Sequence, residues 1–385
     1  MEDSKCECDL PVMCDGGRNI VLFYPHVPSK AKEFVAEALE SRWVGQGPRV
    51  EQFEKRFVET LGIRHRGVAV GAGTDALHLA YVLAGVQAGD EVIVPVFTCT
   101  ATNIPLLYHD VRIRFADIQP RTMNIDVDHV RRLANERTKA IVCVHYGGLP
   151  CDMDELLALA RDLGIPVIED AAHAVGAAYH GEVIGNLSPY TMFSFQAIKH
   201  VTTGDGGMLV LRSEELVEKA ERLRWFGIDR RAKQGGYWRN DIVEVGYKYQ
   251  MNDIGAAIGL AALDELPYIL EHRRRLFQLY QECLGSIPGV EVVGAGYQDR
   301  EHGCWLCTVL VEKREDLVRK LREANIESGQ VHYRNDRYSI FSEFVEPGAY
   351  PNMDRVEPLY LVLPLHTRLV AADVQRICDV ISRGW

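Results

Sequence analysis

Alternating strand-like and helix-like segments in the middle of the chain are the feature that most limits its fold. Apolar strand patterns such as VAVGAG, EVIVPV, AIVCVHY and PVIEDAA occur between about residue 66 and about residue 212, with helical patterns between them. Strands that alternate with helices and are apolar on both faces are typical of a mostly parallel sheet covered by helices. The sequence therefore predicts an α/β fold with three layers, in which helices lie on both faces of the sheet.

A long helical pattern follows this core, with Pro267 as its only interruption and Gly285 as its predicted end. The strands VEVV and CWLCTVLV and two further helical patterns come after it, which indicates a smaller C-terminal α/β domain. We expect an N-terminal extension without fixed structure over residues 1–19, a large domain over 20–262 and a small domain over 263–385.

Composition and charge exclude several classes of protein. No apolar stretch in the 385 residues is long enough to span a membrane, and the acidic N-terminus has no hydrophobic signal core, so we expect a cytoplasmic protein. A net charge of −11 argues against binding nucleic acid, and the basic run HRRRLF at 272–277 is interpreted as a solvated helix face. Cys6, Cys8 and Cys14 lack an evident fourth ligand nearby, so no metal site is predicted.

Lys199 lies in SFQAIKHVTTGDGG, on the connection between the strand patterns YTMFSF and GGMLVL. A solvated loop lysine is the simpler interpretation of such a residue. An amine held against a packed sheet, however, loses solvation, so its pKa falls and it becomes a nucleophile toward a carbonyl carbon. The surroundings of Lys199 therefore decide between the two interpretations.

Two further segments supply possible partners for this amine. Asp170 ends the strand pattern PVIED, at the edge of an α/β sheet where ligands collect, although a turn or helix-capping aspartate is an alternative. Gly71, Ala72 and Gly73 end another strand and Thr74 opens a helix, an arrangement that suits either a phosphate or a tight turn. The third glycine of the dinucleotide-binding fingerprint is missing.

Taken together, these three signals favour one cofactor. Pyridoxal 5'-phosphate (PLP) requires an amine that forms an imine, a carboxylate that keeps a pyridine nitrogen protonated, and a site for its phosphate. Lys199, Asp170 and the turn at Gly73 and Thr74 offer these groups in one predicted sheet.

The segments GAGTDALHLA, IEDAAHAVGA, SFQAIKHVTTGDGG and GYKYQMNDIGAAIG, with RWVGQGPRVEQFE at 42–54, resemble the DegT/DnrJ/StrS-type sugar aminotransferases. These belong to the fold type I PLP enzymes. The resemblance implies that Lys199 binds the cofactor and moves protons, and that Asp170 contacts the pyridine nitrogen. It also implies that Ser194 holds the phosphate together with the backbone at Gly73 and Thr74.

Four positions depart from the family pattern or align loosely with it. His173 stands where the family usually has a glutamine near the phenolic oxygen, and Cys99 stands where an aromatic ring commonly covers the pyridine. Lys248 aligns with an asparagine that reaches the phosphate of the neighbouring subunit's cofactor, and Asn252 follows four residues later. A lysine can supply the same contact as a point charge.

The resemblance implies transfer of an amino group from L-glutamate to a keto-deoxysugar linked to GDP, dTDP or UDP, in a homodimer with shared sites. We expect Trp43 and the basic aromatic segment at 331–341, with His332, Arg334 and Arg337, to bind the nucleotide sugar, although a solvated loop is the alternative for that segment. A sugar dehydratase of the same fold and a non-catalytic regulatory protein are the competing functions. Lys199 argues against the first, and Lys199 with Asp170 against the second.

Overall fold

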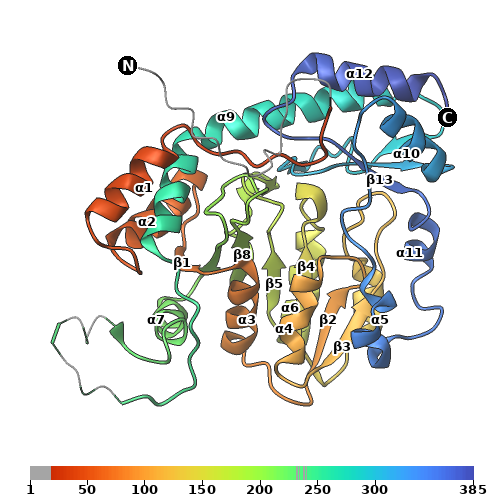
Figure 1. Cartoon of the computed structure of the whole chain (residues 1–385). Coiled ribbons are helices and arrows are strands. Elements are labelled where there is room, and N and C mark those ends of the chain that lie inside the picture. Colours follow the sequence, from red (N-terminus) through yellow and green to blue (C-terminus); the bar gives the residue numbers. More distant parts are fainter. Residues whose placement is uncertain (1–18, 231–232, 234, 237–238, 240) are drawn as a thin grey trace, which may run out of the picture.

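The computed structural model describes residues 19–230, 233, 235–236, 239 and 241–385. Cys6, Cys8 and Cys14, and all but the last residue of the predicted extension, lie outside the described residues. A large sheet with helices on both faces forms one part of the molecule, and a smaller part with its own strands and helices packs beside it (Figure 1).

The central sheet has seven strands in the order β1-β9-β8-β5-β4-β2-β3. β9 is antiparallel to both of its neighbours, whereas β8, β5, β4, β2 and β3 run parallel to one another. The predicted α/β fold with a mostly parallel sheet is therefore confirmed. The strands are β1 (Arg66–Val70), β2 (Glu91–Pro95), β3 (Arg112–Ala116), β4 (Thr138–Val144), β5 (Val167–Asp170), β8 (Tyr190–Ser194) and β9 (Gly207–Leu211).

Both faces of this sheet are buried by helices. Val68 and Val70 of β1 belong to one apolar core, whereas Ala69 between them belongs to a second core with Phe53 and Phe57. This alternation follows from the period of two along a strand, and it explains why the strands read as continuous apolar runs. The helices of this part are α1 (Ala31–Glu40), α2 (Pro48–Leu61), α3 (Gly73–Leu83), α4 (Thr100–Leu107), α5 (Val127–Leu133), α6 (Met153–Leu163) and α7 (Glu214–Leu223).

The smaller part is built on a three-stranded antiparallel sheet in the order β10-β12-β13. Most of its strands and helices form a third apolar core, which also includes Ile20, whereas Met353 and Val356 pack into the first core. The elements are β10 (Val290–Val292), β12 (Cys307–Val311), β13 (Tyr360–Leu363), α10 (Arg314–Glu323), α11 (Pro351–Val356) and α12 (Ala371–Ser382). A short sheet of β6 (Ala178–Tyr179), β7 (Glu182–Val183) and β11 (Arg300–Glu301) connects sequence segments of both parts.

α9 (Asp253–Leu284) joins the two parts, because its first half packs into the second core and its last turns pack into the third. It ends at Gly285, as predicted, but it runs through Pro267 without a break. A proline inside a helix removes one hydrogen bond, and burial of apolar faces at both ends of α9 outweighs that loss. The division at residues 262 and 263 falls within this helix and stays a prediction.

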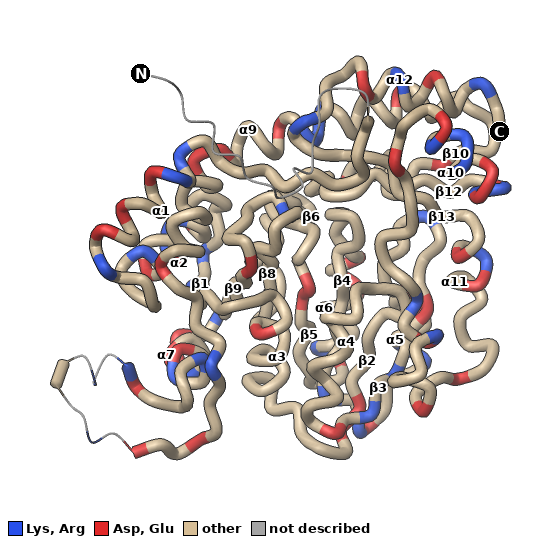
Figure 2. Tube along the Cα trace, in the orientation of Figure 1, with Lys and Arg blue, Asp and Glu red and all other residues tan. Residues whose placement is uncertain are grey.

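Along the outer helices, Lys and Arg positions are interspersed with Asp and Glu positions (Figure 2). None of the described helices combines the length and the apolar composition needed to cross a membrane.

Candidate active site

The carboxyl ends of neighbouring strands bring the predicted residues together at one edge of the central sheet. Asp170 is the last residue of β5 and Ser194 is the last residue of β8, the parallel strand beside it. Ser194 also pairs with Gly207, the first residue of β9, which pairs in turn with Val70 at the end of β1. Three strand ends therefore meet where ligands bind in open α/β sheets.

Glycines leave room for a small anion at this edge. A Cβ atom on Gly73 would lie 3.1 Å from the Ser194 Cβ and 3.2 Å from its Oγ, and one on Gly207 would lie 2.5 Å from the carbonyl oxygen of Ala72. α3 begins at Gly73, Thr74 is its second residue, and no side chain caps its N-terminus. Free N–H groups at a helix N-terminus next to a serine hydroxyl are the donor set that a phosphate requires.

Lys199 lies in the turn between β8 and β9, as predicted, and its Nζ is 3.5 Å from the centre of the Trp305 ring. Burial is the main cause that lowers its pKa to about 7, while the charges of Asp170 and Cys99 oppose this shift and Arg273 adds to it. The lower pKa increases the share of neutral Lys199 amine at neutral pH, which is the form that attacks a carbonyl carbon.

Asp170 is buried and oriented by two donors. The Thr102 hydroxyl donates to its Oδ2 at 2.8 Å, and the Ala172 N–H donates to its Oδ1 at 3.1 Å. Burial raises the pKa of Asp170, while these hydrogen bonds and the charge of Lys199 counteract the rise. A carboxylate fixed in this way can hold a protonated ring nitrogen in one orientation.

His173 and His332 form a stack of parallel rings with Trp305. The His173 ring lies 3.9 Å from the Trp305 ring and 5.3 Å from the His332 ring, measured between centroids. The Gly147 N–H donates to His173 Nδ1, so the proton of the neutral imidazole is on Nε2, which faces His332 Nε2 at 3.5 Å. Burial and the charge of Lys199 lower the pKa of both histidines, that of His332 to about 3, so both are neutral.

Cys99 is the N-cap residue of α4, and its side chain is exposed. Its charge raises the pKa of Lys199, against the effect of burial. The structure therefore brings together eight predicted residues of this region: Gly73, Thr74, Cys99, Asp170, His173, Ser194, Lys199 and His332.

Arg334 is paired with carboxylates of its own chain. Its side chain is 2% exposed, and it pairs with Asp336 at 2.7 Å, Asp354 at 2.5 Å and Glu357 at 2.9 Å. These carboxylates occupy its donors, so Arg334 serves as a structural ion pair centre in this arrangement. Arg337 lies nearer the surface, 3.6 Å from Glu357.

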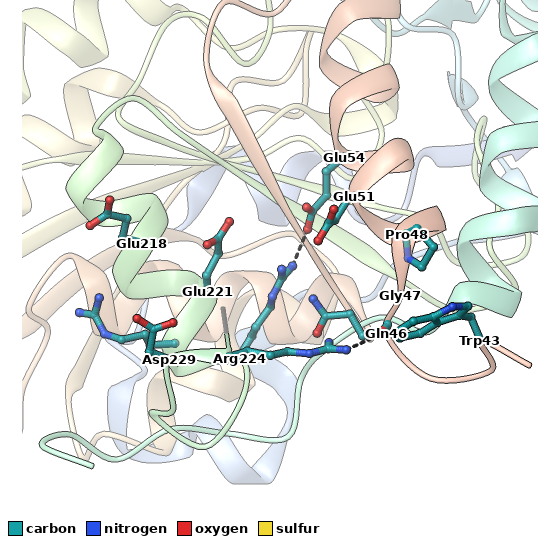
Figure 3. A pocket seen from close by; sticks show the side chains of 12 residues that line it. Trp43, Gln46, Gly47, Pro48, Glu51, Glu54, Glu218, Glu221, Arg224 and Asp229 are labelled. Carbon is teal, nitrogen blue, oxygen red and sulfur yellow. Dashed lines mark hydrogen bonds and ion pairs between the residues drawn. The ribbon is translucent and has the colours of Figure 1, made fainter. Parts of the chain in front are cut away.

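Three other predicted residues do not join the group around Lys199 in a single chain. The Lys248 Nζ lies 3.8 Å from the centre of the Trp225 ring, and Asn252 caps α9 by accepting the Gly255 N–H at 2.8 Å. Trp43 lines a separate pocket of about 680 Å³, where Arg224 pairs with Glu54 (Figure 3). Neither Lys199 nor Asp170 lines that pocket.

Trp305 and Thr102 are site residues that the sequence did not predict. The aromatic residue in HGCWLC is a visible signal, but only the fold shows that it meets Lys199, which is 106 positions earlier in the chain. Thr102 follows Cys99 by three residues, a spacing that puts both on one side of the first turn of a helix.

Known proteins resemble the chain over almost its whole length. The DegT/DnrJ/EryC1/StrS aminotransferase family profile matches residues 26–382. The GDP-perosamine synthase of Escherichia coli O157:H7 is 34% identical over 370 residues, which cover 95% of this chain and 98% of that protein. AtS13 from Actinomadura melliaura has a TM-score of 0.90 and 36% identity, covering 96% of this chain and 100% of its own. The PLP-form of Spr1654 from Streptococcus pneumoniae has a TM-score of 0.88 and 26% identity, covering 95% and 98%.

Proposed function

Since this chain belongs to the DegT/DnrJ/EryC1/StrS aminotransferase family, we propose that it uses PLP to transfer an amino group from L-glutamate to a nucleotide-linked keto-deoxysugar. The family and the structures of sugar aminotransferases with the same fold type I architecture establish that it is an aminotransferase. The cofactor, the donor, the sugar and the roles of single residues are the proposal.

One observation carries the proposal. The buried amine of Lys199 and the buried carboxylate of Asp170 lie near the N-terminus of α3, where free N–H groups can bind an anion. Lys199, Asp170 and the space at Gly73 match the aldehyde, the ring nitrogen and the phosphate of PLP in chemical type. The PLP-form of Spr1654 supports the same cofactor. The residues present therefore fit this group.

Each residue has a role that follows from its surroundings. Lys199 would hold the cofactor and, once released, carry a proton on Nζ between the donor carbon and the cofactor, and in the reverse direction for the acceptor. Asp170 would keep a proton on the ring nitrogen, and Ser194 with the N–H groups of Gly73 and Thr74 would hold the phosphate. When bound, PLP supplies the electron sink that makes the α-hydrogen of an amino acid acidic.

The acceptor sugar is proposed from the relatives and from His332. The GDP-perosamine synthase is named for a sugar nucleotide, which supports a keto sugar linked to GDP, dTDP or UDP as the acceptor. The product would be an amino sugar for a surface polysaccharide or a glycosylated metabolite. His332 is neutral and lies beside His173, so it can donate to a sugar hydroxyl.

We further propose a homodimer that works in the cytoplasm. Apolar side chains gather on the segment around residues 226–245 and are well exposed in the single chain: Phe226, Ile242, Val243 and Val245. Exposed apolar groups of this kind favour an interface with another protein, here a second copy. The mass in solution, measured by light scattering after size exclusion, tests this step.

The absorption spectrum of the purified protein tests the proposal. Bound PLP should give a visible band that L-glutamate bleaches, and keto-sugar nucleotides should restore it. Lys199→Ala should abolish this band and turnover while the protein stays folded, whereas Lys55→Ala, at an exposed position, should change neither. A protein reconstituted with PLP that shows no band, or a Lys199→Ala variant with glutamate-dependent turnover, would contradict the assignment of Lys199.

A further inference from the structure

The interpretation of the basic run HRRRLF at 272–277 as a solvated helix face is wrong for Arg273. Its side chain is buried, with 4% exposed, because α9 turns this residue toward the junction of the two parts. Its Nη1 donates to three backbone carbonyls: Leu365 at 2.8 Å, Trp305 at 3.3 Å and Cys304 at 3.4 Å. Arg273 therefore ties together two loops of the smaller part.

Arg273 carries a charge that no carboxylate of the described residues neutralises. No carboxylate among the described residues lies within ion-pair distance of its guanidinium, and its buried Nε has no hydrogen-bond partner. Burial lowers the pKa of Arg273 to about 10, so it stays charged at neutral pH. Its neighbour Arg274, in contrast, lies 3.5 Å from Glu301. A buried cation without a partner costs free energy, and a neutral side chain with two donors would clamp carbonyls without that cost.

Trp305 connects Arg273 to Lys199, because it contacts both residues. The carbonyl of Trp305 accepts from Arg273, while the Trp305 ring covers the Lys199 amine and its Nε1 donates to the carbonyl of Ile198 at 3.1 Å. His200, the residue after Lys199, contacts the carbonyl of Gly303 through Nε2 at 2.7 Å. The guanidinium is therefore two contacts away from the amine, at a distance where its charge acts on both Lys199 and His200.

We propose that Arg273 is a positioning residue for the lysine site, which holds Trp305 over Lys199 and uses its unpaired charge to keep the amine neutral. This inference rests on the proposed role of Lys199. The other groups that act on the amine or feel its charge are Asp170, Cys99, His173, His200 and His332. Of these, only Asp170 and Cys99 favour the charged amine, and Arg273 opposes them with a cation that stays charged at neutral pH.

Two variants separate the charge of Arg273 from its clamping role. Arg273→Gln keeps amide donors for the carbonyls but removes the charge, whereas Arg273→Lys keeps the charge but loses the planar fork. Arg275→Gln is the matched control, because Arg275 lies two positions along the same helix and is exposed. The pKa of Lys199 is measured on the cofactor-free protein, from the pH dependence of its labelling by a small amine reagent and mass spectrometry of the peptide.

The expected result is a higher pKa of Lys199 in Arg273→Gln and an unchanged pKa in Arg273→Lys and Arg275→Gln. Hydrogen exchange at the Trp305 and Leu306 N–H groups, which donate to the Gly147 carbonyl, should accelerate in Arg273→Lys because the clamp is weaker. If Arg273→Gln does not fold, Arg273→Met takes its place, since it also removes the charge: an unchanged pKa of Lys199 in that variant refutes the proposal, and a raised pKa supports it.

A wild-type pKa of Lys199 in folded Arg273→Gln overturns the proposal and leaves Arg273 as a structural clamp. This outcome leaves the proposed aminotransferase function unchanged, because the absorption spectrum of the wild-type protein tests that function separately. A wild-type protein that binds no PLP but shows the predicted pKa shifts would refute the function and keep the electrostatic role of Arg273.

Discussion

Replacing Lys199 by methionine should stabilise the cofactor-free protein, and the gain should depend on pH. Burial lowers the pKa of Lys199 from 10.5 to about 7, so the unfolded chain binds a proton that the folded chain releases between these two values. Stability contributed by this group therefore rises with pH from about 7 to about 10.5 and is lowest below pH 7. At about 1.4 kcal/mol per pH unit, the charged amine costs the folded state at most roughly 5 kcal/mol at neutral pH.

Methionine has a similar length and no charge, so Lys199→Met avoids this cost. Urea unfolding of both proteins without cofactor, at several pH values from 7 to 10, measures the difference in the free energy of unfolding. The variant should be more stable at pH 7, and its advantage should shrink as the pH rises toward 10. Lys55→Met, at an exposed position, should show no such trend. An advantage that does not change with pH would mean that the Lys199 amine is solvated in the folded protein.

Three further changes test other parts of the site. Asp170→Asn should retain part of the cofactor binding but lower turnover roughly a hundredfold or more, as expected for loss of a group that controls a proton; steady-state kinetics with near wild-type rates would exclude this role. Gly73→Ala should weaken PLP binding and lower the melting temperature somewhat, because the new methyl lies 3.1 Å from the Ser194 Cβ. Gly45→Ala, where nothing lies within 4 Å, should bind PLP normally. Arg334→Gln should lower the melting temperature, since it leaves Asp336, whose side chain is 6% exposed, without its cation; an altered KM for the sugar at unchanged stability would instead support Arg334 as a substrate ligand.

Sequence reasoning succeeded where a residue's chemistry and its place on a strand end coincide. Asp170 ends an apolar strand and Lys199 lies in the turn after another, and parallel strands fix where their ends lie, so the sheet brings both residues to one edge. It did not succeed where a side chain's partners come from distant segments. Arg334 looked like a free donor, but Asp354 and Glu357 reach it from α11 and the residue that follows this helix.

The same reason explains the error at Arg273. A basic run within a helical pattern is usually solvated, and three consecutive arginines cannot all face one direction on a helix. Which of them is buried depends on the side of α9 that meets the smaller part, and the sequence does not give this rotation. The structure turns Arg273 inward, Arg275 outward and Arg274 between them.

The lysine site is consequently a property of the junction between the two parts and not of the central sheet alone. Lys199 and Asp170 come from the sheet, but Trp305 and His332 come from the smaller part. The Trp305 ring covers the Lys199 amine, and burial is the main cause of the low pKa of Lys199. The Trp305 Nε1 donates to the carbonyl of Ile198, so the lysine turn itself is tied to the smaller part. Any movement that separates the parts would let water reach the amine and return its pKa toward 10.5. The packing between the two parts, to which Arg273 contributes, therefore controls the reactivity of Lys199.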